Sequence, residues 1–136
     1  MSDCIFCRIG RKEVKSDIVL ESERLIAIKD INPQAPTHIL IIPKAHYGTL
    51  MDCDDKELLA EMIETAKALA RKLGLDKRGF RTVINTNEEG GQTVFHPHMH
   101  FMAGERSSAG WDKTRRRKKV WLRYYRARFA TAAACS

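Results

Sequence analysis

Three of the five histidines in this chain fall within five residues, at His96, His98 and His100. In an extended strand alternate side chains share a face, so a strand over 94–103 would present all three imidazoles together. A neutral imidazole is nucleophilic near pH 7, and imidazoles also bind metal ions. The glycine pair at 90–91 provides a backbone that can approach a ligand closely. The spacing therefore predicts a site that acts on one small substrate or ion.

A second group with chemical potential opens the chain, where Cys4 and Cys7 form a C-x-x-C pair. Two thiolates at this spacing can bind one metal ion, which would need two further ligands for a tetrahedral site. A redox pair and two small buried hydrophobic residues are the alternatives. The residues alone leave these three interpretations open.

Length and composition favour one soluble domain followed by a basic extension. The chain has 136 residues, no apolar run long enough to span a membrane and no recognisable secretory leader, so we expect a cytoplasmic protein, with a nuclear location also compatible. Residues 112–136 contain nine Lys or Arg and one acid, a net charge of +8, which leaves −1 of the total +7 for residues 1–111. The basic character therefore belongs to the C-terminal segment and does not by itself indicate a nucleic-acid-binding domain.

The elements that would position these groups can be read from hydrophobic periodicity. Five strands are predicted, over residues 18–23, 25–30, 37–43, 80–85 and 94–103. A helix of about 18 residues is predicted after an N-cap at Asp54 or Asp55, and Gly74 would end it. Short connections between the strands favour an α+β fold in which a five-stranded antiparallel sheet packs against one main helix.

Several motifs, taken together, resemble those of the histidine triad (HIT) family, in its Hint-like, zinc-binding branch. They are the alternating histidines followed by Phe101-Met102, the preceding Gly90-Gly91-Gln92-Thr93-Val94, the segment Asp30-Ile31-Asn32-Pro33-Gln34-Ala35-Pro36-Thr37-His38, the segment Ile42-Pro43-Lys44-Ala45-His46, and the N-terminal Cys4-Ile5-Phe6-Cys7. They occur in order over residues 4–106. The resemblance implies a HIT domain over residues 1–106, with residues 107–136 as an extension.

This resemblance implies cleavage of purine nucleoside 5′-phosphoramidates through a nucleotidyl-histidine intermediate. His98 would be the nucleophile, and His100 would donate to the phosphate or the leaving group, while His96 completes the triad. The family pattern implies nucleotide contacts from Asp30, Ile31, Asn85, Gly91, Gln92 and Thr93, and an apolar base pocket built from Phe6, Ile9, Ile28 and Leu40.

The resemblance also implies a structural zinc ion and a homodimer. Cys4, Cys7, His46 and His96 would bind the zinc, because two thiolates and two imidazoles make a closed tetrahedral set that is typical of structural sites. The homodimer would form by extension of the sheet. His38 could support the triad through hydrogen bonds or could be a satisfied core histidine, and the sequence leaves both open.

Two departures from the family pattern limit what can be carried over. Pro97 occupies a spacer within the triad and cannot donate to a sheet, so we expect an unpaired or edge position there. After Arg106 the expected Trp-Pro-Pro-Gly ending is replaced by the basic, aromatic segment 112–129, which could contact an anionic membrane or RNA or could be a solvated extension with no selected role.

Rival functions remain at this point. They are a dinucleoside polyphosphate hydrolase or nucleotidyl transferase, a nucleotide-binding scaffold protein with a basic interaction tail, and a metal-dependent hydrolase that uses all three triad histidines as ligands.

Overall fold

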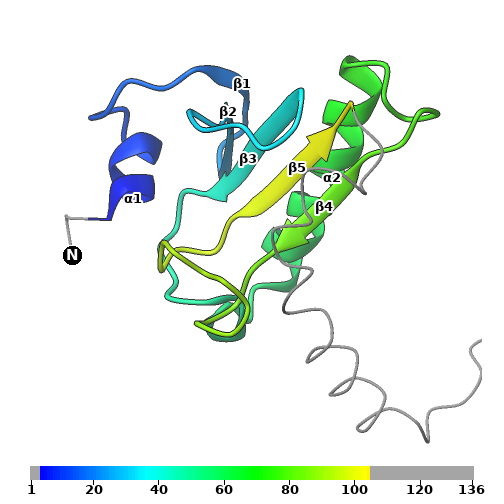
Figure 1. The fold of residues 1–136 in the computed structure, drawn as a ribbon. Helices are drawn as coiled ribbons and strands as arrows, with labels where there is room; N and C mark the ends of the chain where they lie inside the picture. The colour runs from blue at the N-terminus through cyan, green and yellow to red at the C-terminus, as the bar shows by residue number, and fades with distance from the viewer. Residues whose placement is uncertain (1–3, 105–136) are drawn as a thin grey trace, which may run out of the picture. The chain divides into compact units, whose positions relative to one another are not determined.

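The computed structural model describes residues 4–104, which form a five-stranded antiparallel sheet with a helix on each face (Figure 1). The elements in chain order are α1 (Ile5–Gly10), β1 (Ile18–Glu21), β2 (Leu25–Lys29), β3 (Thr37–Pro43), a 3-10 turn (Leu50–Asp52), α2 (Lys56–Lys72), β4 (Arg81–Ile84) and β5 (Met99–Ala103). The strand order in the sheet is β1-β2-β3-β5-β4. The predicted fold class is therefore confirmed, with five strands, antiparallel pairing and one main helix.

Strand β5 begins later than the sequence predicts, and this corrects the expected histidine strand over 94–103. Pairing with β3 starts at Met99 opposite Ile41 and continues to Ala103 opposite Thr37, so only His100 of the three triad histidines lies on the strand. The His96 N–H donates to the Val94 carbonyl at 2.9 Å, which bends the chain, and Pro97 has no N–H to offer a neighbour. His96 and His98 therefore do not share a strand face with His100.

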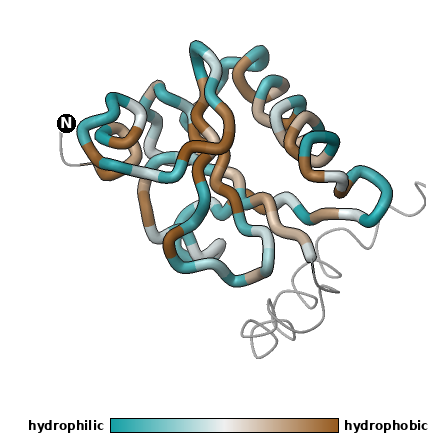
Figure 2. Tube along the Cα trace, turned by 90° about the horizontal axis from the view of Figure 1, so that it is seen from above, coloured by the Kyte–Doolittle hydropathy of each residue, from teal (hydrophilic) through white to brown (hydrophobic). Residues whose placement is uncertain are grey.

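Helix α2 covers one face of the sheet and forms the larger core. Asp55 caps its first turn by accepting a hydrogen bond from the Leu58 N–H at 3.0 Å, and Gly74 lies just past its end with a φ of +69°. The buried hydrophobic residues of α2 and the matching sheet face are Leu58, Met62, Ala66, Leu69, Ala70, Leu25, Ala27, Ile39, Ile41, Met99, Phe101 and Ala103. Figure 2 shows this hydrophobic material concentrated on the strands and on one side of α2.

The short helix α1, which the sequence analysis did not predict, covers part of the opposite face. Phe6 and Ile9 pack there against side chains of β2 and β3, namely Ile26, Ile28, Leu40 and Ile42. His38 and His100 belong to this same face, because they alternate with the residues that face α2. The helix that carries the C-x-x-C pair therefore lies on the triad side of the sheet.

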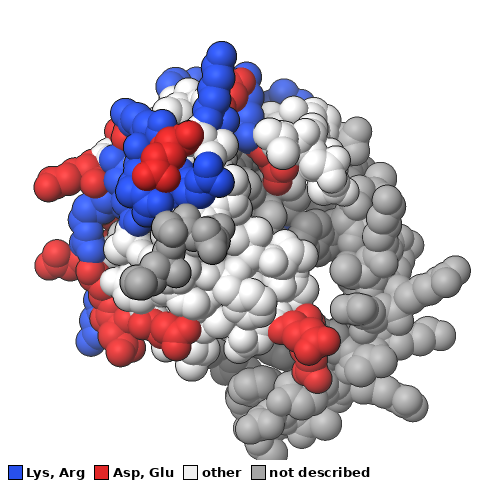
Figure 3. Space-filling model, turned by 90° about the vertical axis from the view of Figure 1, so that its left-hand side faces the viewer, with Lys and Arg blue, Asp and Glu red and all other residues white. Residues whose placement is uncertain are grey.

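Ion pairs attach the end of α1 to the sheet. Glu21 at the end of β1 accepts from Lys12 at 3.0 Å and from Lys44 at 2.8 Å. Figure 3 views the molecule from the α1 side and shows basic and acidic side chains interleaved there. This face of the described residues therefore carries charges of both signs.

The predicted C-terminal extension, 107–136, lies outside the described residues. Within residues 4–104, no helix combines the length and apolar character needed to cross a membrane.

Candidate functional site

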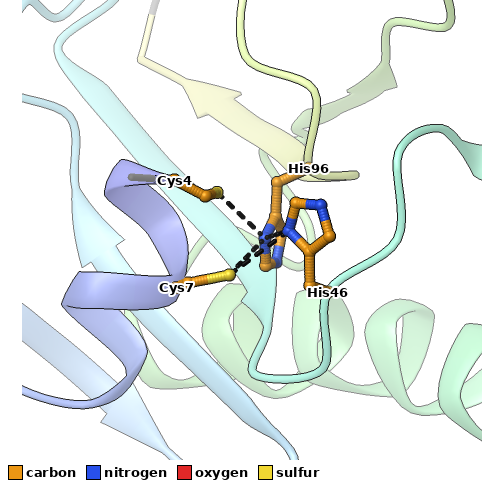
Figure 4. A group of neighbouring side chains, drawn as sticks. All are labelled: Cys4, Cys7, His46 and His96. Carbon is orange, nitrogen blue, oxygen red and sulfur yellow. Dashed lines mark hydrogen bonds between the residues drawn. The ribbon is translucent and has the colours of Figure 1, made fainter. Parts of the chain in front are cut away.

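Four side chains from three separate segments converge at one end of the sheet (Figure 4). Cys4 and Cys7 come from α1 and its N-cap, His46 follows β3, and His96 precedes β5. His96 Nδ1 lies 3.4 Å from Cys4 Sγ, 3.6 Å from Cys7 Sγ and 3.2 Å from His46 Nδ1, while Cys7 Sγ lies 3.2 Å from His46 Nδ1. A tetrahedral zinc ion separates sulfur and nitrogen ligands by about 3.3–3.6 Å. The separations therefore match a zinc site.

The proton positions in this cluster also favour a metal ion. His96 Nε2 lies 2.6 Å from the Pro43 carbonyl oxygen, which can only accept, so Nε2 carries the proton and Nδ1 presents a lone pair to the cluster. Burial and the neighbouring Cys4 raise the pKa of the Cys7 thiol, so without a cation it keeps its proton. A divalent cation that displaced the two thiol protons would be neutralised by the two thiolates, so no net charge would be buried.

His98 is almost fully buried beside this cluster, and one of its ring nitrogens is already used. Its Nδ1 donates to the His96 carbonyl oxygen at 2.8 Å, so a neutral ring presents a lone pair at Nε2. Burial is the main cause that lowers the pKa of His98, although the hydrogen bond to His96 opposes it. The Phe6 ring meets the His98 ring edge to face with centroids 4.8 Å apart. His98 is thus a neutral imidazole whose Nε2 has no hydrogen-bond partner among residues 4–104.

His100 receives its hydrogen-bond partner from the neighbouring strand. The Gln34 backbone N–H donates to His38 Nδ1 at 3.0 Å, so His38 carries its proton at Nε2 and donates it to His100 Nδ1 at 2.9 Å. The proton of a neutral His100 is therefore at Nε2. Burial first, then the nearby His98 and His38, lower the pKa of His100 to about 4, which keeps the ring neutral at pH 7.

Asp30 completes a second group of possible metal ligands, with its Oδ2 3.4 Å from His38 Nε2. The proton positions argue against a metal ion here. A metal ion at His38 Nε2 would require the proton at Nδ1, where it would face the Gln34 N–H. Gln34, His38 and His100 therefore form a hydrogen-bonded chain, with the Asp30 carboxylate beside the His38 Nε2–H, so His38 contacts the triad through a hydrogen bond.

The residues predicted to form an apolar base pocket do lie together. Phe6, Ile9, Ile28 and Leu40 are all buried in the core between α1 and the sheet. Ile31 lies outside that core, with 99% of its surface exposed in the loop after β2. Asp30 is partly buried, and its Oδ1 accepts from the Asn32 N–H at 2.8 Å. Their contacts with a nucleotide stay predictions.

The remaining predicted contacts lie on the connection from β4 to β5. Thr93 and Gly91 are exposed, Asn85 is partly buried, and the Gln92 side chain is buried. The glycine pair has a structural reason that the sequence did not indicate. A Cβ on Gly90 would lie 2.4 Å from the Thr86 carbonyl oxygen, so this turn excludes any larger residue.

Sequence reasoning missed α1 and the two partners that set the ring protons. The Pro43 carbonyl and the Gln34 amide are backbone groups, so no residue type could have marked them. The contact between Phe6 and His98 was also unexpected. The only indication in the sequence was an aromatic residue inside the C-x-x-C pair.

The fold and the site together define an α+β domain with a buried, neutral histidine next to a Cys₂His₂ cluster. The family model for the HIT domain matches residues 11–107. The chain is 43% identical to the purine nucleoside phosphoramidase of Escherichia coli K12 over 104 residues, which cover 75% of this chain and 87% of that protein. It is 44% identical to the 14 kDa zinc-binding protein of Zea mays over 107 residues, which cover 76% and 83% of the two chains. The chain belongs to the HIT family.

Solved structures agree with this assignment. The fold matches the crystal structure of a HIT family hydrolase from Legionella pneumophila Philadelphia 1 with a TM-score of 0.76 and 44% sequence identity. The match covers 79% of this chain and 97% of that one. The predicted family and its fold are therefore confirmed.

Proposed function

We propose that this protein is a purine nucleoside phosphoramidase that cleaves the P–N bond of nucleoside 5′-phosphoramidates through His98. The observation that carries the proposal is the proton arrangement at His98, whose Nδ1 donates to a backbone carbonyl while Nε2 presents a lone pair that no described residue uses. The likeness to the Escherichia coli phosphoramidase supports the substrate class. A burial-lowered pKa keeps the imidazole in its nucleophilic form at neutral pH.

In the first step His98 Nε2 attacks the α-phosphorus, and the bond from phosphorus to nitrogen breaks as that nitrogen takes up a proton from solvent and leaves as a neutral amine. The ring becomes positively charged as the N–P bond forms. Its Nδ1–H already donates to the His96 carbonyl at 2.8 Å, and this hydrogen bond strengthens as the charge develops. The backbone carbonyl thus stabilises the charged state without moving.

His100 serves the phosphate side of the reaction. Because His38 donates to its Nδ1, its proton lies at Nε2, from which it donates to a phosphate oxygen or to the departing amine. In the second step a water molecule attacks the phosphorus and loses a proton to solvent, the N–P bond breaks and returns its electron pair to His98 Nε2, and the nucleoside monophosphate leaves. The same two histidines act in both steps.

Cys4, Cys7, His46 and His96 are proposed to hold a structural zinc ion. The zinc-binding relative from Zea mays supports this assignment alongside the ligand geometry. When bound, zinc would supply a crosslink between α1, the segment that follows β3 and the segment that precedes β5. His96 would contribute Nδ1 to that crosslink while its carbonyl oxygen accepts from His98.

The test is turnover of an adenosine phosphoramidate, measured as AMP release. We expect release by the wild-type protein and a loss of at least about a thousandfold in His98→Asn, because a carboxamide cannot form the covalent intermediate. Lys67→Ala, an exposed position on α2, is the control and should keep wild-type turnover. Equal turnover by His98→Asn and the wild type would refute the nucleophile assignment.

We also infer a homodimer formed through the edge of the sheet. β4 is an edge strand of the sheet, and β5 is its strand partner among the described residues. Ile63 on α2 is exposed and could pack in the same interface. Light scattering that gave a monomer mass at micromolar concentration would contradict the inference.

A further inference from the structure

The side chain of Gln92 is buried, with 6% of its surface exposed, between β4 and β5. Its Oε1 accepts from the Asn87 N–H at 2.8 Å. Its Nε2 donates to the Gly48 and Val94 carbonyl oxygens, each at 3.0 Å. Both amide hydrogens are therefore used inside the protein, and neither is available to a nucleotide.

These hydrogen bonds connect the two segments that supply histidines to the Cys₂His₂ cluster. Gly48 lies two residues after His46, and Val94 lies two residues before His96. Segments 46–48 and 94–98 come from distant parts of the chain and are not strands, so no sheet pairing sets their separation. The Gln92 carboxamide crosslinks them.

The same crosslink reaches the proposed nucleophile. The Val94 carbonyl accepts from both Gln92 Nε2 and the His96 N–H, which closes the bend before β5. That bend places His96 Nε2 against the Pro43 carbonyl oxygen. It also places the His96 carbonyl oxygen against His98 Nδ1. A shift of Val94 would therefore move both His96 Nδ1 and His98 Nε2.

We propose that Gln92 is a positioning residue, whose carboxamide holds the His46 segment and the His96–His98 segment in the arrangement that metal binding and nucleophilic attack require. The effect on turnover rests on the proposed function. The effect on metal binding does not rest on it, so the proposal for Gln92 and the proposed function can be refuted independently.

The test compares three variants of the full chain, Gln92→Glu, Gln92→Met and Gln92→Ala, by two measurements. Zinc affinity is measured by competition with a chromophoric chelator, and kcat and KM are measured with an adenosine phosphoramidate. We expect Gln92→Glu and Gln92→Met to bind zinc about 10–100-fold more weakly, as is usual when a supporting hydrogen bond behind a metal ligand is removed. We expect kcat to fall by a similar factor while KM stays within about twofold, because both amide hydrogens of Gln92 are already used inside the protein.

The order of the variants separates hydrogen bonding from packing. Glu has the shape of Gln but no amide hydrogens, and its carboxylate would face the Gly48 and Val94 carbonyl oxygens, so it should be the most damaging. A residue that only filled space would give the opposite order, with Gln92→Ala the worst. If Gln92→Glu does not fold, Gln92→Met against the wild type still gives the answer, since Met keeps the length and lacks the donors.

Glu89→Ala is the matched control, since Glu89 is exposed on the same turn and contributes no hydrogen bond to this network. It should keep zinc affinity and kcat within about twofold of the wild type. Zinc affinity and kcat that stayed within twofold in both Gln92→Glu and Gln92→Met would overturn the proposal. A wild-type protein that bound zinc but released no AMP would refute the proposed function, while the zinc measurements would still test Gln92.

Discussion

The cluster of Cys4, Cys7, His46 and His96 and the cluster of Asp30, His38 and His100 both bring possible metal ligands within 4.8 Å of one another. They differ in where the protons are. In the first, the Pro43 backbone carbonyl accepts a hydrogen bond from His96 Nε2–H, so the lone pair of His96 Nδ1 faces the other ligands. In the second, the Gln34 backbone amide donates to the lone pair of His38 Nδ1, so His38 Nε2–H faces His100. Ligand type and distance therefore do not define a metal site until the backbone partner of each ring is known.

The two clusters also divide the labour of the triad between them. His96 faces the first, His100 belongs to the second, and His98 lies between them, where its ring meets that of His100 edge to face at 4.9 Å. His96 and His100 both carry their proton at Nε2. They differ in which nitrogen is used inside the protein, since Nε2–H of His96 donates to the Pro43 carbonyl and leaves the Nδ1 lone pair, whereas Nδ1 of His100 accepts from His38 and leaves the Nε2–H. His98, between them, is the opposite tautomer, with its proton at Nδ1.

The largest effect should come from removing a thiolate. We expect Cys7→Ser to lower bound zinc from about one equivalent per chain to well below half, because two thiolates and two imidazoles make the closed set. His38→Phe should keep a full equivalent. Metal analysis of the two purified proteins measures the zinc content per chain. Loss of zinc in His38→Phe with a full equivalent in Cys7→Ser would show that the second cluster, and not the first, binds the metal.

The next largest effect concerns the second cluster. His38→Phe keeps a ring but removes the donor to His100 Nδ1, so the proton of His100 is no longer directed to Nε2. We expect kcat for the phosphoramidate to fall by about 10–100-fold, with a smaller change in KM. His38→Gln retains an amide donor and should recover part of the loss. Unchanged kcat in His38→Phe would show that the hydrogen bond does not matter to turnover.

A moderate effect is expected on the pH dependence of stability. The pKa of His100 is about 4 in the folded protein and 6.5 as an ordinary value, so between these pH values the unfolded chain binds more protons. The free energy of unfolding should therefore fall as the pH drops from 6.5 to 4, by up to about 3 kcal/mol from this residue. Above pH 6.5 His100 should contribute no pH dependence.

Urea unfolding of the wild type and His100→Gln at pH 7.5 and pH 5 measures this contribution. The variant should lose less stability than the wild type on acidification, because it lacks the buried imidazole. Equal losses in the two proteins would show that the His100 ring is not held neutral by the fold.

The smallest effect should come from Lys44→Ala. Lys44 lies two residues from His46 and forms a partly exposed ion pair with Glu21 at 2.8 Å. Pairs of this kind contribute little, so we expect the melting temperature to change by about 2 °C or less. Zinc content and kcat should match the wild type. A large loss of zinc here would mean that the ion pair, and not the ligand set, holds the first cluster together.

Sequence patterns predicted most of the elements because those elements follow local rules. The apolar stripe of α2, the Asp55 cap and the Gly74 ending were all visible in the sequence, and strand 37–43 has the predicted bounds. Strand β5 was predicted five residues too long, since alternation continued through residues that the structure bends away. Helix α1 was missed because six residues show too little periodicity and its packing against β2 and β3 is a tertiary contact.

What the sequence determined by itself is the set of reactive groups, namely the triad, the C-x-x-C pair and the histidine after β3, together with the fold that carries them. Only the tertiary structure decided how each ring is used. His96 takes its tautomer from a carbonyl 53 residues away, and His100 takes its own from a ring 62 residues away. A proton follows its nearest partner in space, and in this protein those partners are backbone groups and side chains that only folding brings together.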